Sequence, residues 1–118
     1  MSGLESCKSL PVYNSTVNEN KIRIPVSLFA ENNLQIVRIQ NILHDVAVKK
    51  ESETSYTALL LRCTHADNAL TVTGNGFYCN LHGSTFDNEG AVTKGPAEIS
   101  LKKYKTLIDG DEILILID

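Results

Sequence analysis

The amino-acid sequence predicts an all-β domain from three observations. Polar and apolar residues alternate over short runs such as 21–26 and 34–39, which is the period of a half-buried strand. Turn-forming pairs, Gly74-Asn75 and Asp109-Gly110, separate such runs. No window shows helical periodicity over three turns, and only residues 27–31 are compatible with a short turn of helix. The three observations agree on strands joined by tight turns.

Each predicted strand has its own residue pattern, and turn or loop residues separate it from the next. Pro25 near the end of the first run suggests an edge or a bend, because proline cannot donate to a strand ladder. The charged and hydroxyl-rich residues 49–55 are typical of a hairpin connection. Asp109-Gly110 readily supplies the positive φ angles of a tight turn. The predicted strands cover residues 21–26, 34–39, 42–48, 56–62, 70–73, 76–78, 104–108 and 112–117.

The size and composition of the chain are those of one globular domain. It has 118 residues, of which 42% are hydrophobic and 21% charged. A formal net charge of −3 with scattered basic residues argues against nucleic acid as a partner. No apolar run approaches the roughly 18 residues that a membrane-spanning helix needs. We expect one domain over residues 21–118, preceded over residues 1–20 by a flexible lead-in or tether rich in Asn and Ser.

Two short clusters carry the chemistry of this chain. Residues 63–65 read C-T-H and residues 79–82 read C-N-L-H, so that the whole pattern is C-x-H-x13-C-x-x-H. The first cluster follows an apolar strand and the second ends a short one, and a hairpin lies between them. We therefore expect two loops that project side by side from one end of a small sheet. The candidate metal ligands are Cys63, His65, Cys79 and His82.

Two metal centres fit two thiols and two imidazoles. In a [2Fe–2S] cluster with mixed ligation, one iron takes both thiolates and the other takes both imidazoles. A tetrahedral zinc ion also accepts a Cys2His2 set, although its usual pairing joins like ligands. Structural zinc typically compensates for a small core, which a chain with this many strands hardly needs. The surroundings favour iron, and a zinc-stabilised binding module without redox activity remains the alternative.

The residues after the second cluster add to this pattern. Gly83 follows His82 directly and would let the backbone approach a cluster closely. Ser84 comes next, and residues 95–97, Gly-Pro-Ala, can make a rigid loop over the remaining side.

With these residues the chain resembles the Rieske family, in which C-x-H and C-x-x-H are followed by Gly-Ser and later by a Gly-Pro-Ala loop. The resemblance covers residues from about 58 to 117. It implies an antiparallel β sandwich with a small cluster-binding subdomain at about 62–97, and a Rieske-type [2Fe–2S] cluster as cofactor. It further implies that Cys63 and Cys79 ligate an inner ferric site. His65 and His82 would then ligate an outer iron near the molecular tip.

Because of its departures from the family's respiratory members, the chain looks more like the ferredoxin or oxidase-small-subunit branch. Asn68 and Leu81 stand where those members carry two further cysteines, joined in a disulfide. Ser84 matches a serine whose hydroxyl bonds a bridging sulfide, whereas Phe86 replaces a tyrosine that bonds a ligand thiolate. Hydrogen bonds to sulfur raise the reduction potential. Because one of these two hydrogen-bond donors is kept and the other is lost, we expect an intermediate reduction potential within the family's roughly −150 to +300 mV.

The residues around the two clusters can also have purely structural roles. Ser84 could cap a turn, and Phe86 could anchor the core under the cluster loop. Leu81 and Ala66 are expected near the tip, where exposed apolar surface marks a docking site, although Leu81 could equally shield the cluster from water.

The predicted function is one-electron transfer to or from a larger redox enzyme or complex. After the ligands are assigned only His44 remains, so the second iron site of an oxygenase, with two histidines and a carboxylate, is missing. There is no Gly-rich nucleotide fingerprint either. The expected partners are redox proteins, namely an oxygenase, a reductase, or a quinol- or arsenite-oxidising complex.

The N-terminus leaves the location open. Cys7 followed by the polar residues 14–20 looks somewhat like a lipid-modified cysteine on a flexible tether, which would place the domain outside the cytoplasm at a membrane. Glu5 fits such a cleavage site poorly and no apolar signal segment precedes it, so a free cysteine is the other reading.

Overall fold

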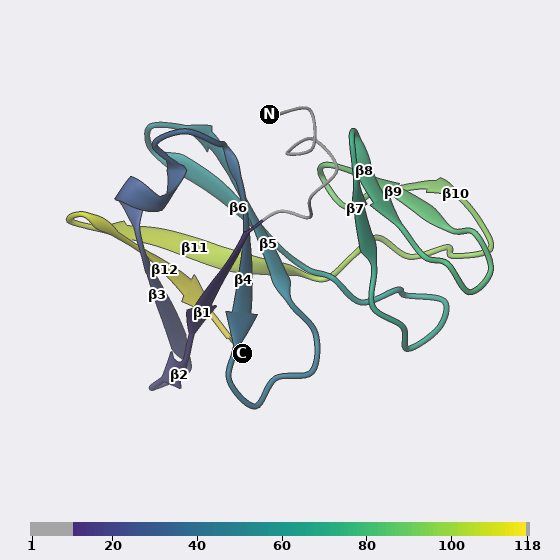
Figure 1. Cartoon of the computed structure of the whole chain (residues 1–118), viewed down its shortest axis with the longest axis horizontal. Coiled ribbons are helices and arrows are strands. Elements are labelled where there is room, and N and C mark those ends of the chain that lie inside the picture. The colour runs from purple at the N-terminus through teal and green to yellow at the C-terminus, as the bar shows by residue number, and fades with distance from the viewer. Residues whose placement is uncertain (1–10, 118) are drawn as a thin grey trace, which may run out of the picture.

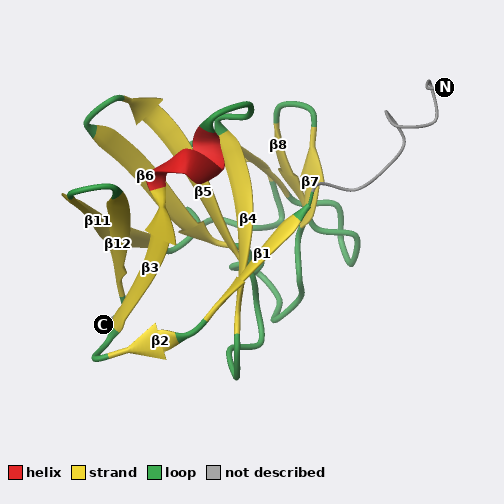
Figure 2. Ribbon diagram, turned by 60° about the vertical axis from the view of Figure 1, so that its left-hand side comes forward, coloured by secondary structure: helices red, strands yellow, loops and turns green. Residues whose placement is uncertain are grey.

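The structure, a computed structural model, describes residues 11–117, and within them it contains strands in two sheets and one short 3-10 helix (Figure 1). The all-β prediction is confirmed. The 3-10 helix, η2 (Val26–Phe29), occupies the single place where the sequence allowed a helical turn (Figure 2). Cys7 and the first ten residues of the predicted lead-in or tether lie outside the described residues. Among those residues, none belongs to a helix of the length and apolar character that crossing a membrane would require.

The larger sheet has eight strands in the order β1-β4-β5-β6-β11-β12-β3-β2. Its neighbours are antiparallel except β1 and β4, which run parallel. The sheet curls, so that the Ser15 hydroxyl of β1 reaches the Arg23 carbonyl of β3 at 3.4 Å and the unit is barrel-like (Figures 1 and 2). Its strands are β1 (Val12–Ser15), β2 (Val17–Asn18), β3 (Lys21–Pro25), β4 (Leu34–Ile39), β5 (Val46–Ser52), β6 (Ser55–Leu60), β11 (Lys103–Asp109) and β12 (Glu112–Leu116).

The smaller sheet has four strands in the order β10-β9-β8-β7 and lies beside the larger one (Figure 1). The chain enters it after β6 and returns from it to β11, so the small sheet is an insertion between two paired strands of the larger sheet. It lies inside the range 62–97 predicted for a subdomain. Its strands are β7 (Thr71–Thr73), β8 (Gly76–Tyr78), β9 (Thr85–Asp87) and β10 (Val92–Lys94).

The prediction of a loose lead-in over residues 1–20 is wrong for the part that the structure describes. β1 pairs with β4 along its whole length, with Val12 opposite Ile36, and β2 pairs with β3. Tyr13 packs against the main core. The segment is polar because much of it lies at the surface, and its order comes from ladder hydrogen bonds that composition does not reveal.

The core consists of two buried clusters, the first of which lies within the larger sheet and its 3-10 helix. In the larger sheet, the alternation read from the sequence holds: Ile22 and Ile24 are fully buried and Arg23 between them is exposed. The second cluster joins the large sheet to the small one, through residues such as Leu59 and Phe77, and it contains both Cys63 and Cys79. The two thiols are therefore part of the apolar packing between the sheets.

The small sheet depends on a glycine at the first position of β8. Gly76 is buried opposite Asp87, and a Cβ atom there would overlap the backbone carbonyl oxygen of Phe86. Gly74, two residues earlier, would place a Cβ atom in open space without a positive φ angle.

We therefore expect Gly76→Ala to lower the free energy of unfolding by about 1–3 kcal/mol or more, because β8 and β9 must separate to admit the methyl group. Gly74→Ala is the matched control and should change the free energy of unfolding little. Chemical denaturation followed by circular dichroism measures both. Equal stability of the two variants would contradict the close pairing of β8 with β9.

Candidate metal centre

Two loops carry the predicted ligands. The first ligand loop, residues 63–70, follows β6 and is closed at its base by a bridge between Arg62 and Ala69. The second ligand loop, residues 79–84, joins β8 to β9 and is closed by hydrogen bonds from Cys79 N–H to the Ser84 carbonyl (2.9 Å) and from Gly83 N–H to the Cys79 carbonyl (3.0 Å). Gly83 has φ +86°, a left-handed conformation that favours glycine. The tight turn therefore accounts for the presence of glycine at this position.

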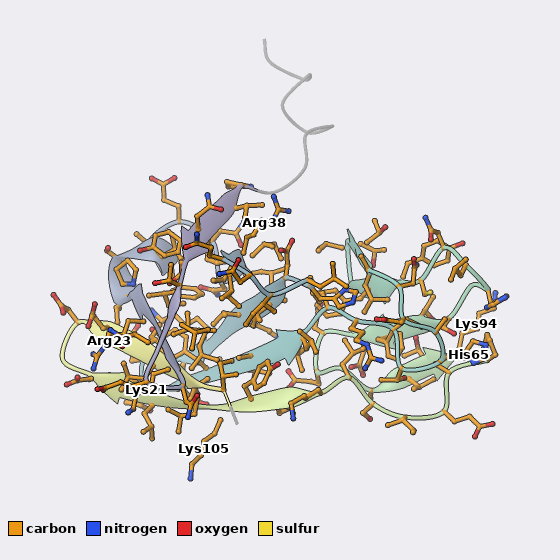
Figure 3. All side chains as sticks on the ribbon, turned by 90° about the horizontal axis from the view of Figure 1, so that it is seen from below. Lys21, Arg23, Arg38, His65, Lys94 and Lys105 are labelled. Atoms are coloured by element: carbon orange, nitrogen blue, oxygen red, sulfur yellow. The ribbon has the colours of Figure 1, made fainter. Side chains whose placement is uncertain are left out.

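The four predicted ligands divide into a buried pair and an exposed pair. Cys63 and Cys79 are each 1% exposed, are not joined in a disulfide, and hydrogen-bond to each other through their side chains. His65 and His82 are exposed, and their ring centroids lie 5.2 Å apart in an edge-to-face arrangement. His65 lies at the end of the molecule far from Lys21 and Arg23 of the large sheet (Figure 3).

The surroundings of Cys79 favour its thiolate. Burial alone would raise the pKa of this thiol, but several hydrogen bonds to the sulfur act in the other direction and the net shift of the pKa is downward. The donors are the backbone N–H groups of Leu81 and His82 and the side chains of Cys63 and Asn68. Because the thiolate is the metal-binding form of cysteine, the site is prepared for a ligand.

The arrangement of the predicted ligands can be compared with what each kind of centre needs. A structural zinc site takes four ligands around one ion. A mixed-ligand [2Fe–2S] cluster needs two pairs, thiols on one iron and imidazoles on the other, and the residues fit that requirement.

Ser84 links the second ligand loop to residues 95–97. Its side chain is fully buried, and its Oγ accepts a hydrogen bond from Ala97 N–H at 3.0 Å. The bond uses an oxygen lone pair, so the hydroxyl hydrogen can be donated elsewhere. The Gly95-Pro96-Ala97 segment, with a cis bond before its proline, therefore packs against the second ligand loop.

The position of Phe86 fits the alternative in which it anchors the core under the cluster loop. It is 2% exposed, lies in β9 opposite Phe77, and belongs to the apolar cluster between the sheets. Near the histidines, Leu81 is 54% exposed and Ile99 67% exposed, while Ala66 is half-buried. Ile99 adjoins the first ligand loop, because its carbonyl accepts a hydrogen bond from the Thr64 hydroxyl.

Sequence reasoning missed an anchor of the first ligand loop. Asp67 accepts hydrogen bonds at one oxygen from Arg62 Nε (2.8 Å) and His44 Nε2 (3.0 Å). The hydrogen bond from Arg62, followed by that from His44, lowers the pKa of the Asp67 carboxyl. His44 belongs to the loop between β4 and β5, so this anchor ties the ligand loop to the large sheet. No local sequence pattern indicates this contact, because His44 and Asp67 are 23 residues apart in the sequence.

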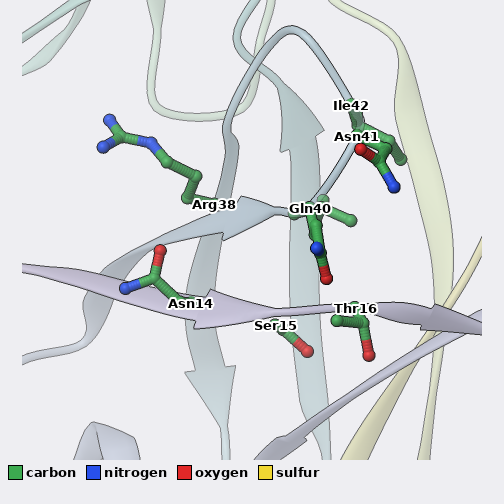
Figure 4. A pocket seen from close by; sticks show the side chains of 8 residues that line it. Asn14, Ser15, Thr16, Arg38, Gln40, Asn41 and Ile42 are labelled. Atoms are coloured by element: carbon green, nitrogen blue, oxygen red, sulfur yellow. The ribbon is translucent and has the colours of Figure 1, made fainter.

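A separate hollow of about 510 Å³ lies between β1 and the end of β4 (Figure 4). It is lined by Asn14, Ser15, Thr16, Arg38, Ile39, Gln40, Asn41 and Ile42. Its charged residue, Arg38, is paired with Asp45 through two hydrogen bonds of 3.0 Å. Its lining contains no Cys, His, Asp or Glu, and none of the predicted ligands.

Comparison with known proteins points to one family. Residues 24–105 match the family model described as Rieske [2Fe-2S] domain. The cytochrome b6-f complex iron-sulfur subunit of Synechococcus elongatus is 33% identical over 72 residues, which cover 59% of this chain and 40% of the relative. That of Chlorobaculum thiosulfatiphilum is 34% identical over 61 residues, covering 50% and 34%. The chain thus matches two fifths or less of the length of these relatives.

Solved structures show the same fold. The cyanobacterial plasma membrane Rieske protein PetC3 from Synechocystis PCC 6803 aligns with a TM-score of 0.61 and 26% identity, over 79% of this chain and 96% of that one. The ferredoxin of carbazole 1,9a-dioxygenase from Nocardioides aromaticivorans IC177 aligns with a TM-score of 0.57, over 85% and 100% of the two chains. Its 21% identity supports the fold alone.

The anchor at Asp67 yields a pH prediction. A carboxyl whose pKa is lowered in the folded protein stabilises the fold above its unfolded pKa, and this contribution is lost as the pH falls through the folded pKa. We expect a pKa for Asp67 below the ordinary value of 3.8, and Arg62→Gln should raise it toward that value. A titration of the carboxyl resonance by nuclear magnetic resonance measures both.

Arg38→Gln is the matched control, because Arg38 pairs with Asp45 instead. It should leave the titration of Asp67 unchanged. An Asp67 carboxyl that titrates alike in the Arg62→Gln variant and the parent protein would show that Arg62 does not anchor the loop.

Proposed function

The chain belongs to the Rieske [2Fe–2S] domain family, and from this premise we propose that it passes single electrons to or from a larger redox protein. Its cofactor is a Rieske-type [2Fe–2S] cluster. The observation that carries the proposal is the division of the candidate ligands into two buried thiols and two exposed imidazoles. A redox centre needs a dry side that protects it and an open side that a partner can reach.

We assign the ligands in pairs. Cys63 and Cys79 would hold the inner iron, because they adjoin each other in the apolar layer between the sheets. His65 and His82 would hold the outer iron, because their rings lie together at the surface. When bound, the cluster supplies one-electron chemistry.

Residues of the chain determine the access of water and of a partner to the site, and the electrostatics around the sulfur atoms. The buried layer around the thiols excludes water from the sulfur side of the site. Hydrogen bonds donated to Cys79 favour additional negative charge there, which favours the reduced state. The exposed imidazoles give the partner a close approach to the outer side of the site.

The docking face would be the apolar surface beside the histidines. Leu81 and Ile99 are both large, apolar and exposed; Leu81 lies in the second ligand loop and Ile99 adjoins the first. Exposed apolar side chains around a functional tip are typical of a surface that binds another protein. The partner would be an oxygenase, a reductase, or a quinol- or arsenite-oxidising complex. A tether through Cys7 would suit the last of these.

Metal analysis tests the proposal. The purified protein should contain about two irons and two acid-labile sulfides per chain, with a reduced-state electron paramagnetic resonance signal whose average g value lies below that of the free electron. His82→Ala should lose this signal. The matched control is His44→Gln, since His44 hydrogen-bonds to Asp67 and is not assigned as a ligand. A colourless protein with one zinc per chain would overturn the proposal.

Ser84 gives a second prediction. If its hydroxyl hydrogen is donated to a bridging sulfide, Ser84→Ala should lower the reduction midpoint, because the donor stabilises the added electron. The variant also removes the acceptor for Ala97 N–H, so some loss of stability, about 1–3 kcal/mol, is expected as well.

Protein-film voltammetry measures the midpoint, and the parent value should lie between the extremes of the family's roughly −150 to +300 mV. Ser100→Ala, at an exposed serine outside the ligand loops, is the control and should leave the midpoint where it is. If Ser84→Ala retains iron and has the parent midpoint, Ser84 does not bond the sulfide.

A further inference from the structure

Asn68 reaches from one ligand loop to the other. It lies in the first ligand loop, and its backbone carbonyl accepts a hydrogen bond from the N–H of Cys63 at 2.9 Å. Its side-chain nitrogen lies 3.1 Å from Oδ1 of Asn80 and 3.5 Å from Sγ of Cys79, both in the second ligand loop. One residue therefore touches both cysteines of the candidate centre, one through its backbone and one through its side chain.

The chemistry of the neighbours identifies which end of the Asn68 amide faces them. The same side-chain atom lies 3.1 Å from the carbonyl oxygen of Ala69, which can only accept a hydrogen bond. A ligand sulfur as thiolate is likewise an acceptor. The amide NH2 group satisfies both neighbours, whereas the amide oxygen would face two acceptors. Asn68 is thus a donor toward the sulfur.

We propose that Asn68 is a positioning residue of the cluster site, whose side-chain amide holds the two ligand loops together and donates a hydrogen bond to the Cys79 sulfur. This inference rests on the proposed ligand set. Donation to a ligand sulfur stabilises the charge of the added electron, so Asn68 raises the reduction potential. The bond to Asn80 fixes the distance between the loops and with it the spacing of the buried thiols.

The place of Asn68 in the first loop is itself fixed. The preceding residue, Asp67, is held by Arg62 and by His44 from the β4–β5 loop. The backbone N–H of Asn68 donates to the Ala66 carbonyl at 2.8 Å. The loop that carries the Asn68 amide is therefore already anchored to the large sheet. Forming the hydrogen bond to the Cys79 sulfur does not require a flexible segment to become ordered. Such preorganisation makes each hydrogen bond more effective.

The other donors to Cys79 differ from Asn68 in origin. The N–H groups of Leu81 and His82 belong to the backbone of the second loop itself, and side-chain substitution leaves them in place. Apart from the bond between the Cys63 and Cys79 thiols themselves, the side-chain hydrogen bonds within residues 11–117 that cross between the ligand loops are those of Asn68 to Cys79 and Asn80. Its contribution can thus be removed without changing the backbone donors.

Three variants separate the two roles of the amide. Asn68→Leu keeps the size and removes the donor, so we expect a lower midpoint potential and faster loss of iron to a chelator. Asn80→Ala removes the cross-loop partner and keeps the bond to sulfur, so iron should be lost faster with the midpoint little changed. Asn75→Leu, at an exposed turn outside both ligand loops, is the matched control for both measurements.

A spectroscopic measurement separates hydrogen bonding from packing. The iron–sulfur stretching bands in the resonance Raman spectrum shift on exchange into heavy water when N–H groups donate to sulfur. In Asn68→Leu this shift should be smaller than in the parent protein, which a merely structural role would not cause.

The outcomes distinguish this inference from the proposed function. If the parent protein lacks the Rieske signal, the ligand set itself is wrong. If parent and Asn68→Leu both show the signal with equal midpoints and equal deuterium shifts, the role of Asn68 is overturned and the ligand set stands. Should Asn68→Leu fail to hold iron, a crystal structure of the loaded parent decides, since an amide nitrogen of Asn68 beyond hydrogen-bond distance of the Cys79 sulfur contradicts the proposal.

Discussion

Two thiolates need a dry, hydrogen-bonded interior, while two imidazoles must stand in reach of a partner, and a single site has to satisfy both requirements. Here the thiols of Cys63 and Cys79 belong to the apolar layer between two sheets, and His65 and His82 lie beyond them at the surface. The small sheet provides one side of this layer: the first ligand loop leads into β7, the second joins β8 to β9, and Phe77 and Phe86 belong to the same buried cluster as the thiols. Without the insertion between β6 and β11, the larger sheet would have no such interface.

The loops are held by polar contacts that complement the apolar layer. Ser84 ties the second loop to residues 95–97, Asp67 ties the first to the large sheet, and Asn68 joins the two loops. The sequence suggested an unbraced site, because the places of a family disulfide hold Asn68 and Leu81. The structure replaces that picture with a non-covalent link. Hydrogen bonds of this kind keep the sulfur environment polar enough for a thiolate while the surrounding side chains exclude water.

Much of this could be predicted from sequence, for a physical reason. Ligand spacing and strand alternation are local properties, so the positions of the clusters and most strands of the larger sheet followed from residues close in the chain. Contacts between distant segments did not follow. The pairing of β1 with β4 and the bond from His44 to Asp67 depend on how separate elements meet. Residues 12–18 were misjudged because Asn and Ser on an exposed strand resemble those of a loop.

Mössbauer spectroscopy of protein enriched in iron-57 shows whether the ligands act in two unlike pairs, because each iron gives its own signal. We expect two inequivalent ferric sites in the oxidised protein, with the added electron localised on one of them after reduction and nitrogen ligation at that same iron. Two equivalent irons, or a reduced iron with sulfur ligands alone, would contradict the pairing of buried thiols against exposed imidazoles.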